Sequence, residues 1–264
     1  MPRYFVDTNC IVGMTFFHDR WYREVQSLFE HNHVFTSDAT IWEYCVRRDG
    51  DPPVPEDPTT WKIKPDDDAG KYGEIRDELN AKLPKIHTKI DRLGSDELTI
   101  DALADVVFEH FKIRDEAKPD VKAALEDYFE DRALIPFQAK RGVSHLIDRI
   151  LYTSEHNKQV LVEAMTIKES TYHQMDSEYV EICNNTDGYI QHSDLCIILD
   201  GIAAAQSKLV TGDGGYLHAH HFVHEEWGLS IMWAEHEFYT DNLLFPEEEL
   251  LGPVPEMEQK QAPD

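Results

Sequence analysis

The sequence predicts an α/β fold in which a parallel sheet flanked by helices is interrupted by an inserted all-helical subdomain. Short apolar strands alternate with amphipathic helices near both ends of the chain, which is the pattern of an α/β sheet. A cluster of prolines follows the first of these segments, and a long stretch of helical periodicity follows the prolines. Because distant segments can supply neighbouring strands, the simplest arrangement is one sheet that carries the helical block as an insertion.

The first α/β segment, residues 1–49, contains two strand–helix pairs. Residues 4–6 form a short apolar strand, and apolar residues between Trp21 and Phe29 then recur at helical spacing, i, i+4, i+7 and i+8. Residues 33–36 form a second apolar strand. The serine that follows this strand is a favourable N-cap for the next helix.

The middle of the chain differs in composition. Residues 50–66 are predicted to be a linker, because their prolines break regular elements; these are Pro52, Pro53, Pro55, Pro58 and Pro65. Residues 67–187 are expected to form the inserted helical subdomain, with one or two helices over 159–183. At the far end, residues 245–264 are rich in Glu and Pro and are expected to form a loosely ordered acidic tail.

The second α/β segment covers residues 188–244. A helix is predicted over 193–206, because apolar residues recur at i, i+3, i+4 and i+7 from Leu195. Strands are predicted at 209–211 and 229–233, each a run of apolar residues. Together the two segments form the expected sheet domain.

The charge of the chain is strongly unbalanced. Its 264 residues include 51 acidic and 25 basic side chains, which gives a formal charge of −26. An acidic surface repels nucleic acids and gains nothing from anionic lipids. The acids are spread along the chain, which favours a surface adapted to concentrated salt, where the Debye length shrinks to ~3 Å at 1 M. We expect a halophilic source; avoidance of polyanions in general is the alternative.

Several protein classes are disfavoured by composition. Hydrophobic residues make up 41% of the chain, which is enough for a buried core and argues against wholesale disorder. No apolar run approaches the ~20 residues of a membrane span, and the first residues contain no signal-peptide stretch, so we expect a cytoplasmic location without a membrane partner. The four cysteines form no CxxC pair, so neither a disulfide framework nor a zinc–cysteine site is indicated.

Four acids occupy informative positions. Asp7 and Asp213 each follow a predicted strand, and ligands of parallel sheets bind beyond the carboxyl ends of the strands. Asp194 begins a helix, where the partial positive charge favours an anion, and Glu43 lies about one turn into another helix. Each has a simpler interpretation as a cap, a turn residue or a solvated side chain. All four at one edge of a sheet are much less expected by chance.

Short motifs surround these acids. In chain order they are Phe5-Val6-Asp7-Thr8-Asn9, Ser37 with Glu43 six residues on, Ser193-Asp194, and Leu209-Val210-Thr211-Gly212-Asp213. Together they resemble the PIN-domain nuclease family, which has a strand–Asp–Thr–Asn opening, a helical Glu, a helix-leading Asp and a strand–Thr–x–Asp close. The resemblance covers residues 3–48 and 188–237, under half of the chain. The span between the second and third motifs departs from compact PIN domains, because it is far longer.

The resemblance implies metal-dependent endoribonuclease activity, with RNA phosphodiesters as substrate and Mg²⁺ or Mn²⁺ as cofactor. Hard divalent cations prefer carboxylate oxygen, and two such ions about 4 Å apart can activate water and stabilise a leaving oxygen. The metal ligands and catalytic residues expected from the resemblance are Asp7, Glu43, Asp194 and Asp213. Groups expected to orient these carboxylates are Thr8, Asn9 and Thr211. We expect Arg47 and Arg48, about one turn beyond Glu43, to hold substrate phosphates.

Two other functions stay open. In the first, the chain is an inactive PIN scaffold that binds protein or RNA through its helical insertion. In the second, it is a haloacid-dehalogenase-type phosphatase. The phosphatase is disfavoured because Asn9 stands where that family places a general acid. The sequence is compatible with three kinds of nuclease: a toxin with an antitoxin-like protein partner, an RNA-processing factor and a DNA-directed enzyme. It is also compatible with a homodimer.

Three further expectations concern the neighbourhood of the site. The helical insertion leaves after Glu43 and returns before Asp194, so it should form a lid or side wall beside the site; a remote stabilising or dimerising block is the alternative. Asp200 lies about 600° around its helix from Asp194 and is therefore excluded from the site. The histidines that follow Asp213 lack an HExxH pattern and are interpreted as part of a polar helix; they are His218, His220, His221 and His224.

Overall fold

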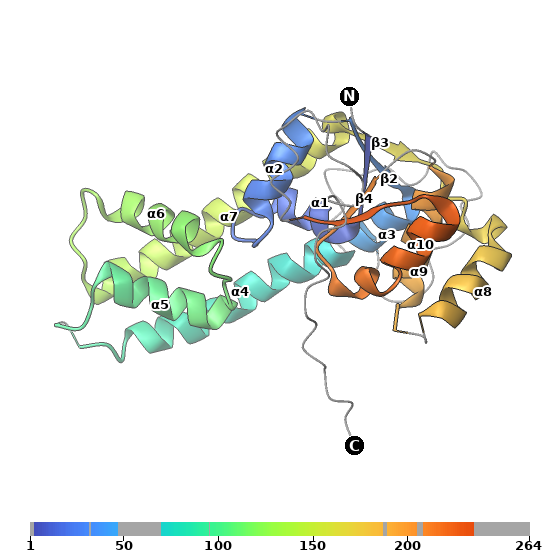
Figure 1. The fold of residues 1–264 in the computed structure, drawn as a ribbon. Coiled ribbons are helices and arrows are strands. Elements are labelled where there is room, and N and C mark those ends of the chain that lie inside the picture. Colours follow the sequence, from blue (N-terminus) through green and yellow to red (C-terminus); the bar gives the residue numbers. More distant parts are fainter. Residues whose placement is uncertain are drawn as a thin grey trace, which may run out of the picture.

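In the computed structural model, five parallel strands among the described residues form a sheet in the order β3-β2-β1-β4-β5. The structure describes residues 3–31, 33–46, 70–94, 96–186, 189–204 and 208–234. The strands are β1 (Arg3–Val6), β2 (His33–Ser37), β3 (Met165–Lys168), β4 (Lys208–Thr211) and β5 (Ile231–Trp233). Helices flank this sheet, so the predicted α/β class is confirmed (Figure 1).

Helices cover both faces of the sheet because successive strand residues point to opposite sides. Tyr4 and Val6 belong to one buried cluster, whereas Phe5 between them belongs to the other. The first face is covered by α1 (Thr8–Thr15), α2 (Tyr22–His31) and α3 (Asp38–Cys45). The second is covered by α8 (Asp176–Asn185), α9 (His192–Ala203) and α10 (His220–Trp227). A sheet buried on both faces explains why its strands are continuously apolar.

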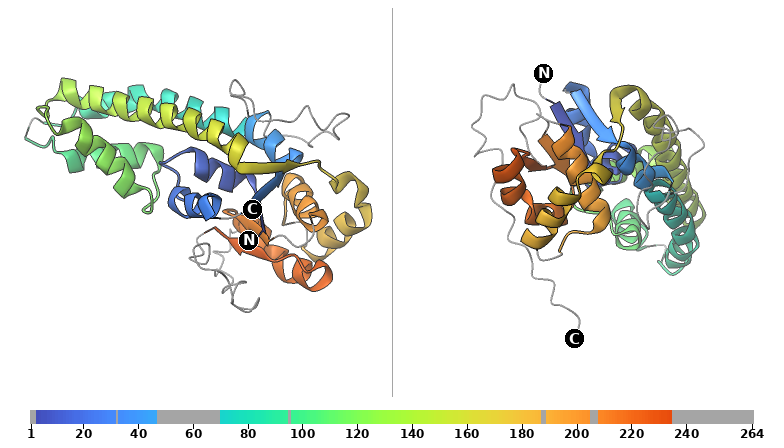
Figure 2. Two further views of the ribbon diagram at one scale, coloured as in Figure 1. Left: turned by 90° about the horizontal axis from the view of Figure 1, so that it is seen from above. Right: turned by 90° about the vertical axis from the view of Figure 1, so that its right-hand side faces the viewer.

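Four helices form an arm that projects from the sheet domain (Figure 1). They are α4 (Gly70–Ile90), α5 (Ile100–Phe111), α6 (Lys118–Phe129) and α7 (Pro136–Ala164). The long helices α4 and α7 run side by side, with α5 and α6 at the distal end (Figure 2). At the base of the arm, the ring of Tyr72 lies 5.4 Å from that of Phe16 and 5.8 Å from that of Tyr44. The apolar core of the arm is therefore continuous with the core on the first face of the sheet.

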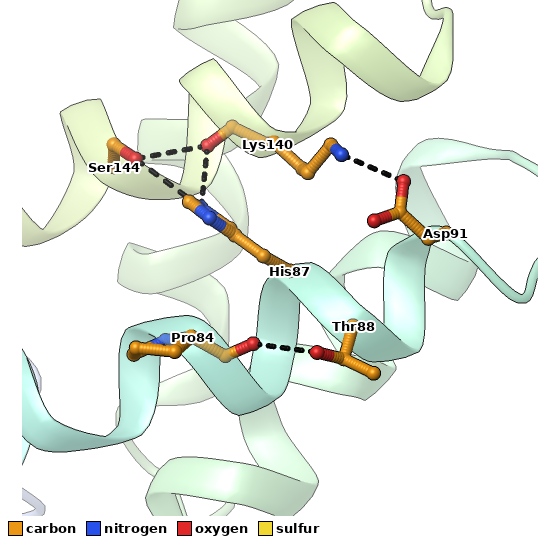
Figure 3. Close-up of polar contacts among 6 residues, drawn as sticks. All are labelled: Pro84, His87, Thr88, Asp91, Lys140 and Ser144. Carbon is orange, nitrogen blue, oxygen red and sulfur yellow. Dashed lines mark hydrogen bonds and ion pairs between the residues drawn. The ribbon is translucent and has the colours of Figure 1, made fainter.

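Polar contacts also join α4 to α7 (Figure 3). The Lys140 ammonium lies 2.6 Å from Asp91, and the His87 ring lies 3.2 Å from the Lys140 carbonyl and 3.3 Å from the Ser144 hydroxyl. These contacts hold the distal ends of the two long helices together.

The middle of the chain is not entirely helical, which corrects the expectation for residues 67–187. Met165–Lys168 forms the edge strand β3 and pairs in parallel with β2, from Val34↔Met165 to Ser37↔Lys168. The helical arm therefore ends at Ala164. The helices expected over 159–183 are present as the end of α7 and most of α8, but β3 lies between them. The reason is physical: a four-residue edge strand in which only Met165 is buried leaves too short a pattern to distinguish from the preceding helix.

Other expectations concern segments that lie outside the described residues. These are the linker at 50–66 and the acidic tail at 245–264. Within the described ranges, no helix combines the length and apolar composition that crossing a lipid bilayer requires.

The charge leads to a prediction about salt. Even if every basic side chain were paired, an excess of 26 carboxylates would have no counter-charge. Because salt screens their mutual repulsion, we expect the unfolding temperature to fall as KCl is lowered below about 0.5 M. Calorimetry across a KCl series measures this. An unfolding temperature that is the same in dilute and in concentrated KCl would contradict a salt-adapted surface.

Candidate functional site

One pocket of ≈ 320 Å³ contains all four predicted acids. It lies where β1 and β4 end and where α1 and α9 begin, which is the edge at which parallel sheets bind ligands. Its lining residues are Asp7, Thr8, Asn9, Glu43, Lys71, Gln191, Ser193, Asp194, Asp213 and Tyr216. The topology thus brings together acids that are up to 206 positions apart in the sequence.

Asp7 is held by two hydrogen bonds. Its Oδ1 accepts from the backbone N–H of Cys10 at 2.9 Å, which caps α1, and its Oδ2 accepts from the Thr211 hydroxyl at 2.6 Å. Asp7 therefore has the capping role of the simpler interpretation and also faces the pocket. Burial raises its pKa to about 6, although the bonds from Thr211 and Cys10 oppose this rise.

Glu43 reaches the pocket from α3. The Thr8 hydroxyl donates to its Oε2 at 2.6 Å, so the residue after Asp7 orients the second acid. Thr8 and Thr211 thus contact carboxylates in the way that the sequence predicts for orienting groups. Asn9, the second residue of α1, also lines the pocket.

Asp213 follows β4 in a tight turn. Its backbone N–H donates to the Thr211 hydroxyl at 2.9 Å, and its Oδ1 accepts from the backbone N–H of Gly215 at 2.8 Å. The turn role and the pocket position again coexist. Thr211 contacts both Asp7 and Asp213, so it links the two acids that end β1 and β4.

Asp194, in the first turn of α9, interacts electrostatically with the other three acids. Burial, the largest cause, and repulsion from Asp213, Glu43 and Asp7 together raise its pKa to about 7. A hydrogen bond from the Tyr216 hydroxyl opposes this rise. The charges of the other three carboxylates therefore act on Asp194 as well as its burial.

Three lining residues were missed by sequence reasoning: Lys71, Gln191 and Tyr216. Tyr216 is buried, and burial together with the four carboxylates holds its pKa well above the usual range, so its hydroxyl stays a donor toward Asp194. Nothing in the sequence around Tyr216 indicates this contact. Lys71 is the second residue of α4, and only the packing of the arm against the sheet domain brings it to the pocket.

The insertion contributes to the site less than expected. Its first helix supplies Lys71 to the pocket wall, which fits a side wall. The helices α5 and α6 supply no lining residue and lie at the distal end of the arm, so they do not form a lid (Figure 1).

The remaining predicted residues have varied positions. Arg47 and Arg48 lie outside the described residues. Asp200 is buried and accepts hydrogen bonds from the backbone of Thr171 at 2.8 Å and of Tyr172 at 3.0 Å, so it holds the segment before α8 and does not line the pocket. The four histidines after Asp213 lie on a short 3-10 turn (Gly214–His218) and on α10.

The donor chemistry of the pocket fits a hard divalent cation. Carboxylate oxygens are the ligands that Mg²⁺ and Mn²⁺ prefer. The pKa of Asp194 is raised by burial and then by repulsion from the other three acids, and such a cation would neutralise that repulsion. Among the described residues, no three His, Cys, Asp or Glu side chains lie close enough together to hold a metal ion as they stand. Binding at this pocket therefore requires side-chain rotation or bridging water.

Comparison with known proteins adds no relative to this picture. No family model matches the chain, and no significant match is found among curated proteins or solved structures. The class that fold and site define is an α/β protein with a four-carboxylate pocket at the carboxyl edge of a parallel sheet.

Protons and divalent cations should compete for this pocket. The raised pKa values of Asp7 and Asp194, about 6 and about 7, mean that the metal-free fold binds protons that the unfolded chain has released. This proton binding adds to the free energy of unfolding at low pH, and the added stability is lost as pH rises through 6 to 7. A cation binds the deprotonated pocket, so the rise in unfolding temperature caused by Mn²⁺ should grow between about pH 5.5 and 8. Thermal unfolding in Mn²⁺ and in KCl of equal ionic strength measures this rise. A rise in unfolding temperature that does not change with pH would contradict the assignment of a cation site to this pocket.

Proposed function

We propose that the protein is a metal-dependent endoribonuclease that hydrolyses RNA phosphodiester bonds. One observation carries the proposal: Asp7, Glu43, Asp194 and Asp213 line a single pocket and act on one another electrostatically. Such a cluster of carboxylates is unfavourable without a cation and suits cation-assisted phosphodiester hydrolysis. The resemblance of the surrounding motifs to PIN-domain nucleases supports the same activity.

The residues of the pocket have distinct roles in this proposal. The four carboxylates would hold Mg²⁺ or Mn²⁺, which supplies Lewis-acid activation and charge compensation for phosphodiester cleavage. Thr211 fixes Asp7 and the turn that carries Asp213, and Thr8 fixes Glu43. Buried Tyr216 donates a hydrogen bond that fixes Asp194. These bonds hold the acids in defined positions before a substrate arrives.

The two alternatives are less well supported. Asn9 lines the pocket two residues after Asp7, and an amide cannot deliver the proton that a haloacid-dehalogenase-type phosphatase requires there. An inactive scaffold has no need for four intact acids held by hydrogen bonds from neighbouring threonines and a tyrosine.

An RNA cleavage assay tests the proposal. Labelled single-stranded RNA of mixed sequence is incubated at high salt with Mn²⁺, Mg²⁺ or chelator, beside DNA of the same sequence and a phosphate monoester. We expect cleavage of RNA that needs the cation and leaves the monoester intact. Hydrolysis of only the monoester would favour the phosphatase, cleavage of only DNA would change the substrate class, and no cleavage would favour the scaffold.

The biological role of such a nuclease is a separate proposal. A toxin-type nuclease should arrest growth when it is expressed without a protein inhibitor, whereas an RNA-processing nuclease should be tolerated. Growth after induced expression of the wild-type chain, with an Asp194→Asn variant as control, distinguishes the two roles.

A further inference from the structure

Helix α4 is basic in a chain that is otherwise acidic. Residues 70–90 contain five basic and three acidic side chains, whereas the whole chain has a formal charge of −26. The excess of positive charge on this helix is therefore opposite to the general trend of the molecule.

Four of these basic residues lie on one face of the helix. At 3.6 residues per turn, Lys71, Lys82, Lys85 and Lys89 fall within about 60° of one another; we call this surface the α4 basic face. The buried residues of α4, including Tyr72, Leu79 and Ile86, fall about 90° away and belong to the core that the arm shares with the first face of the sheet. With a rise of 1.5 Å per residue, the α4 basic face extends about 27 Å along the arm.

The proximal end of the α4 basic face lies in the carboxylate pocket. Lys71 lines the pocket and forms no hydrogen bond or ion pair with another described residue. The neighbouring Gly70 fixes this position, since a Cβ built on it would lie 2.6 Å from the carbonyl oxygen of Glu43. From there α4 runs outward from the sheet domain (Figure 1).

The distal end of the α4 basic face presents ammonium groups that have no ion-pair partner among the described residues. Lys85 and Lys89 are exposed and form no ion pair within the described ranges. Lys82 is compensated by Glu78 and lies over the ring of Phe111. Two further acids lie near this face: Glu74 is exposed on the first turns, and buried Asp19 is close enough to Lys71 for the ammonium to lower its pKa. Positive charge is therefore concentrated at Lys71 and again at Lys85 and Lys89.

We propose that the α4 basic face binds the sugar-phosphate backbone of a single RNA strand and leads it to the carboxylate pocket. The inference rests on the proposed function, because it names how the substrate of that site is held. Ammonium groups bind phosphates without regard to sequence, and the acidic remainder of the surface repels the strand from other paths. Lys71 is a positioning residue: it holds a phosphate beside the four acids.

A charge-matched pair of variants tests the distal part of the face. Lys85→Gln with Lys89→Gln is compared with Arg114→Gln with Lys122→Gln, which removes the same charge from the turn before α6 and from α6 itself. Fluorescence anisotropy of labelled single-stranded RNA is measured in chelator over a salt series, so no cleavage occurs. The plot of log affinity against log salt should flatten by about 1.4 for the first pair, about 0.7 for each lost phosphate contact. The second pair should keep the wild-type slope.

The results separate this inference from the proposed function. Equal salt slopes for the two pairs of variants would overturn the inference. It would also be overturned if the slope of the first pair flattened with labelled poly-glutamate, used as a second polyanion, but not with RNA. If the first pair alone loses RNA binding while the wild type cleaves no RNA, the binding surface stands and the nuclease proposal fails. Cleavage by the wild type with equal slopes for both pairs gives the opposite result.

Two substitutions test Lys71. Lys71→Gln should lower kcat about 10-fold with little change in KM, because the pocket then lacks the Lys71 ammonium group that fixes the phosphate. Lys71→Arg should restore most of kcat, and both variants should melt at the wild-type temperature. A wild-type kcat for Lys71→Gln, or a loss that Lys71→Arg does not restore, would remove Lys71 from the inference.

Discussion

Replacement of Asp194 by Asn is expected to reduce metal-dependent RNA cleavage by about 100-fold or more, since even groups that only orient metal ligands contribute 10–100-fold. Asp194 is the acid on which burial and the charges of Asp213, Glu43 and Asp7 converge. The substitution keeps the shape of the side chain but removes the charge that would hold the cation. Initial rates of RNA cleavage over a Mn²⁺ titration measure the effect.

The same variant should be more stable than the wild type without metal. An amide does not suffer the burial and repulsion that raise the pKa of Asp194, so the unfolding temperature in chelator should rise. Asp200→Asn is a matched control, because Asp200 lies on the same helix and is bonded to the backbone of Thr171 and Tyr172 outside the pocket. Its cleavage rate should remain near that of the wild type. An Asp194→Asn variant that cleaves at the wild-type rate would refute the site.

The core of the site was predictable because its signals are local. Asp7 and Asp213 follow short apolar strands, and the carboxyl ends of parallel strands share one edge, so adjacency follows from the fold class. Asp194 and Glu43 lie on helices whose faces follow from periodicity. The sequence alone leaves open whether Asp7 and Asp213 have a capping or turn role or a site role. In the structure each residue has both roles.

The rest of the site was not predictable because its signals are tertiary. Lys71 reaches the pocket only through the docking of the arm, and Tyr216 only through the path of the turn after Asp213. The strand β3 was missed because a 29-residue helix runs into it without a glycine or proline between them. A strand at the edge of a sheet also needs a partner to be recognised, and β2 lies about 130 residues earlier in the chain.

Gly70→Ala should be the most damaging small substitution at the base of the arm. Gly70 has φ +60, and an added Cβ would lie 2.6 Å from the Glu43 carbonyl oxygen and 2.8 Å from that of Tyr44. The left-handed backbone alone costs roughly 1–2 kcal/mol for a residue with a side chain. The clash is with backbone, which cannot rotate away, so we expect a loss of about 2 kcal/mol or more in the free energy of unfolding, or ~4–8 °C in the unfolding temperature.

The effect on function should exceed the effect on stability. Relief of the clash moves the start of α4 away from α3, and this displaces Lys71 and Glu43 together at the pocket. Cleavage measured well below the unfolding temperature should therefore fall, with RNA binding weakened as well. Gly94→Ala is the control, because its nearest neighbour is the flexible Glu97 side chain at 3.5 Å, and it should change stability by less than about 0.5 kcal/mol. If Gly70→Ala cleaves and melts as the wild type does, the arm and the pocket are not coupled through this contact, and the position of Lys71 must be set elsewhere.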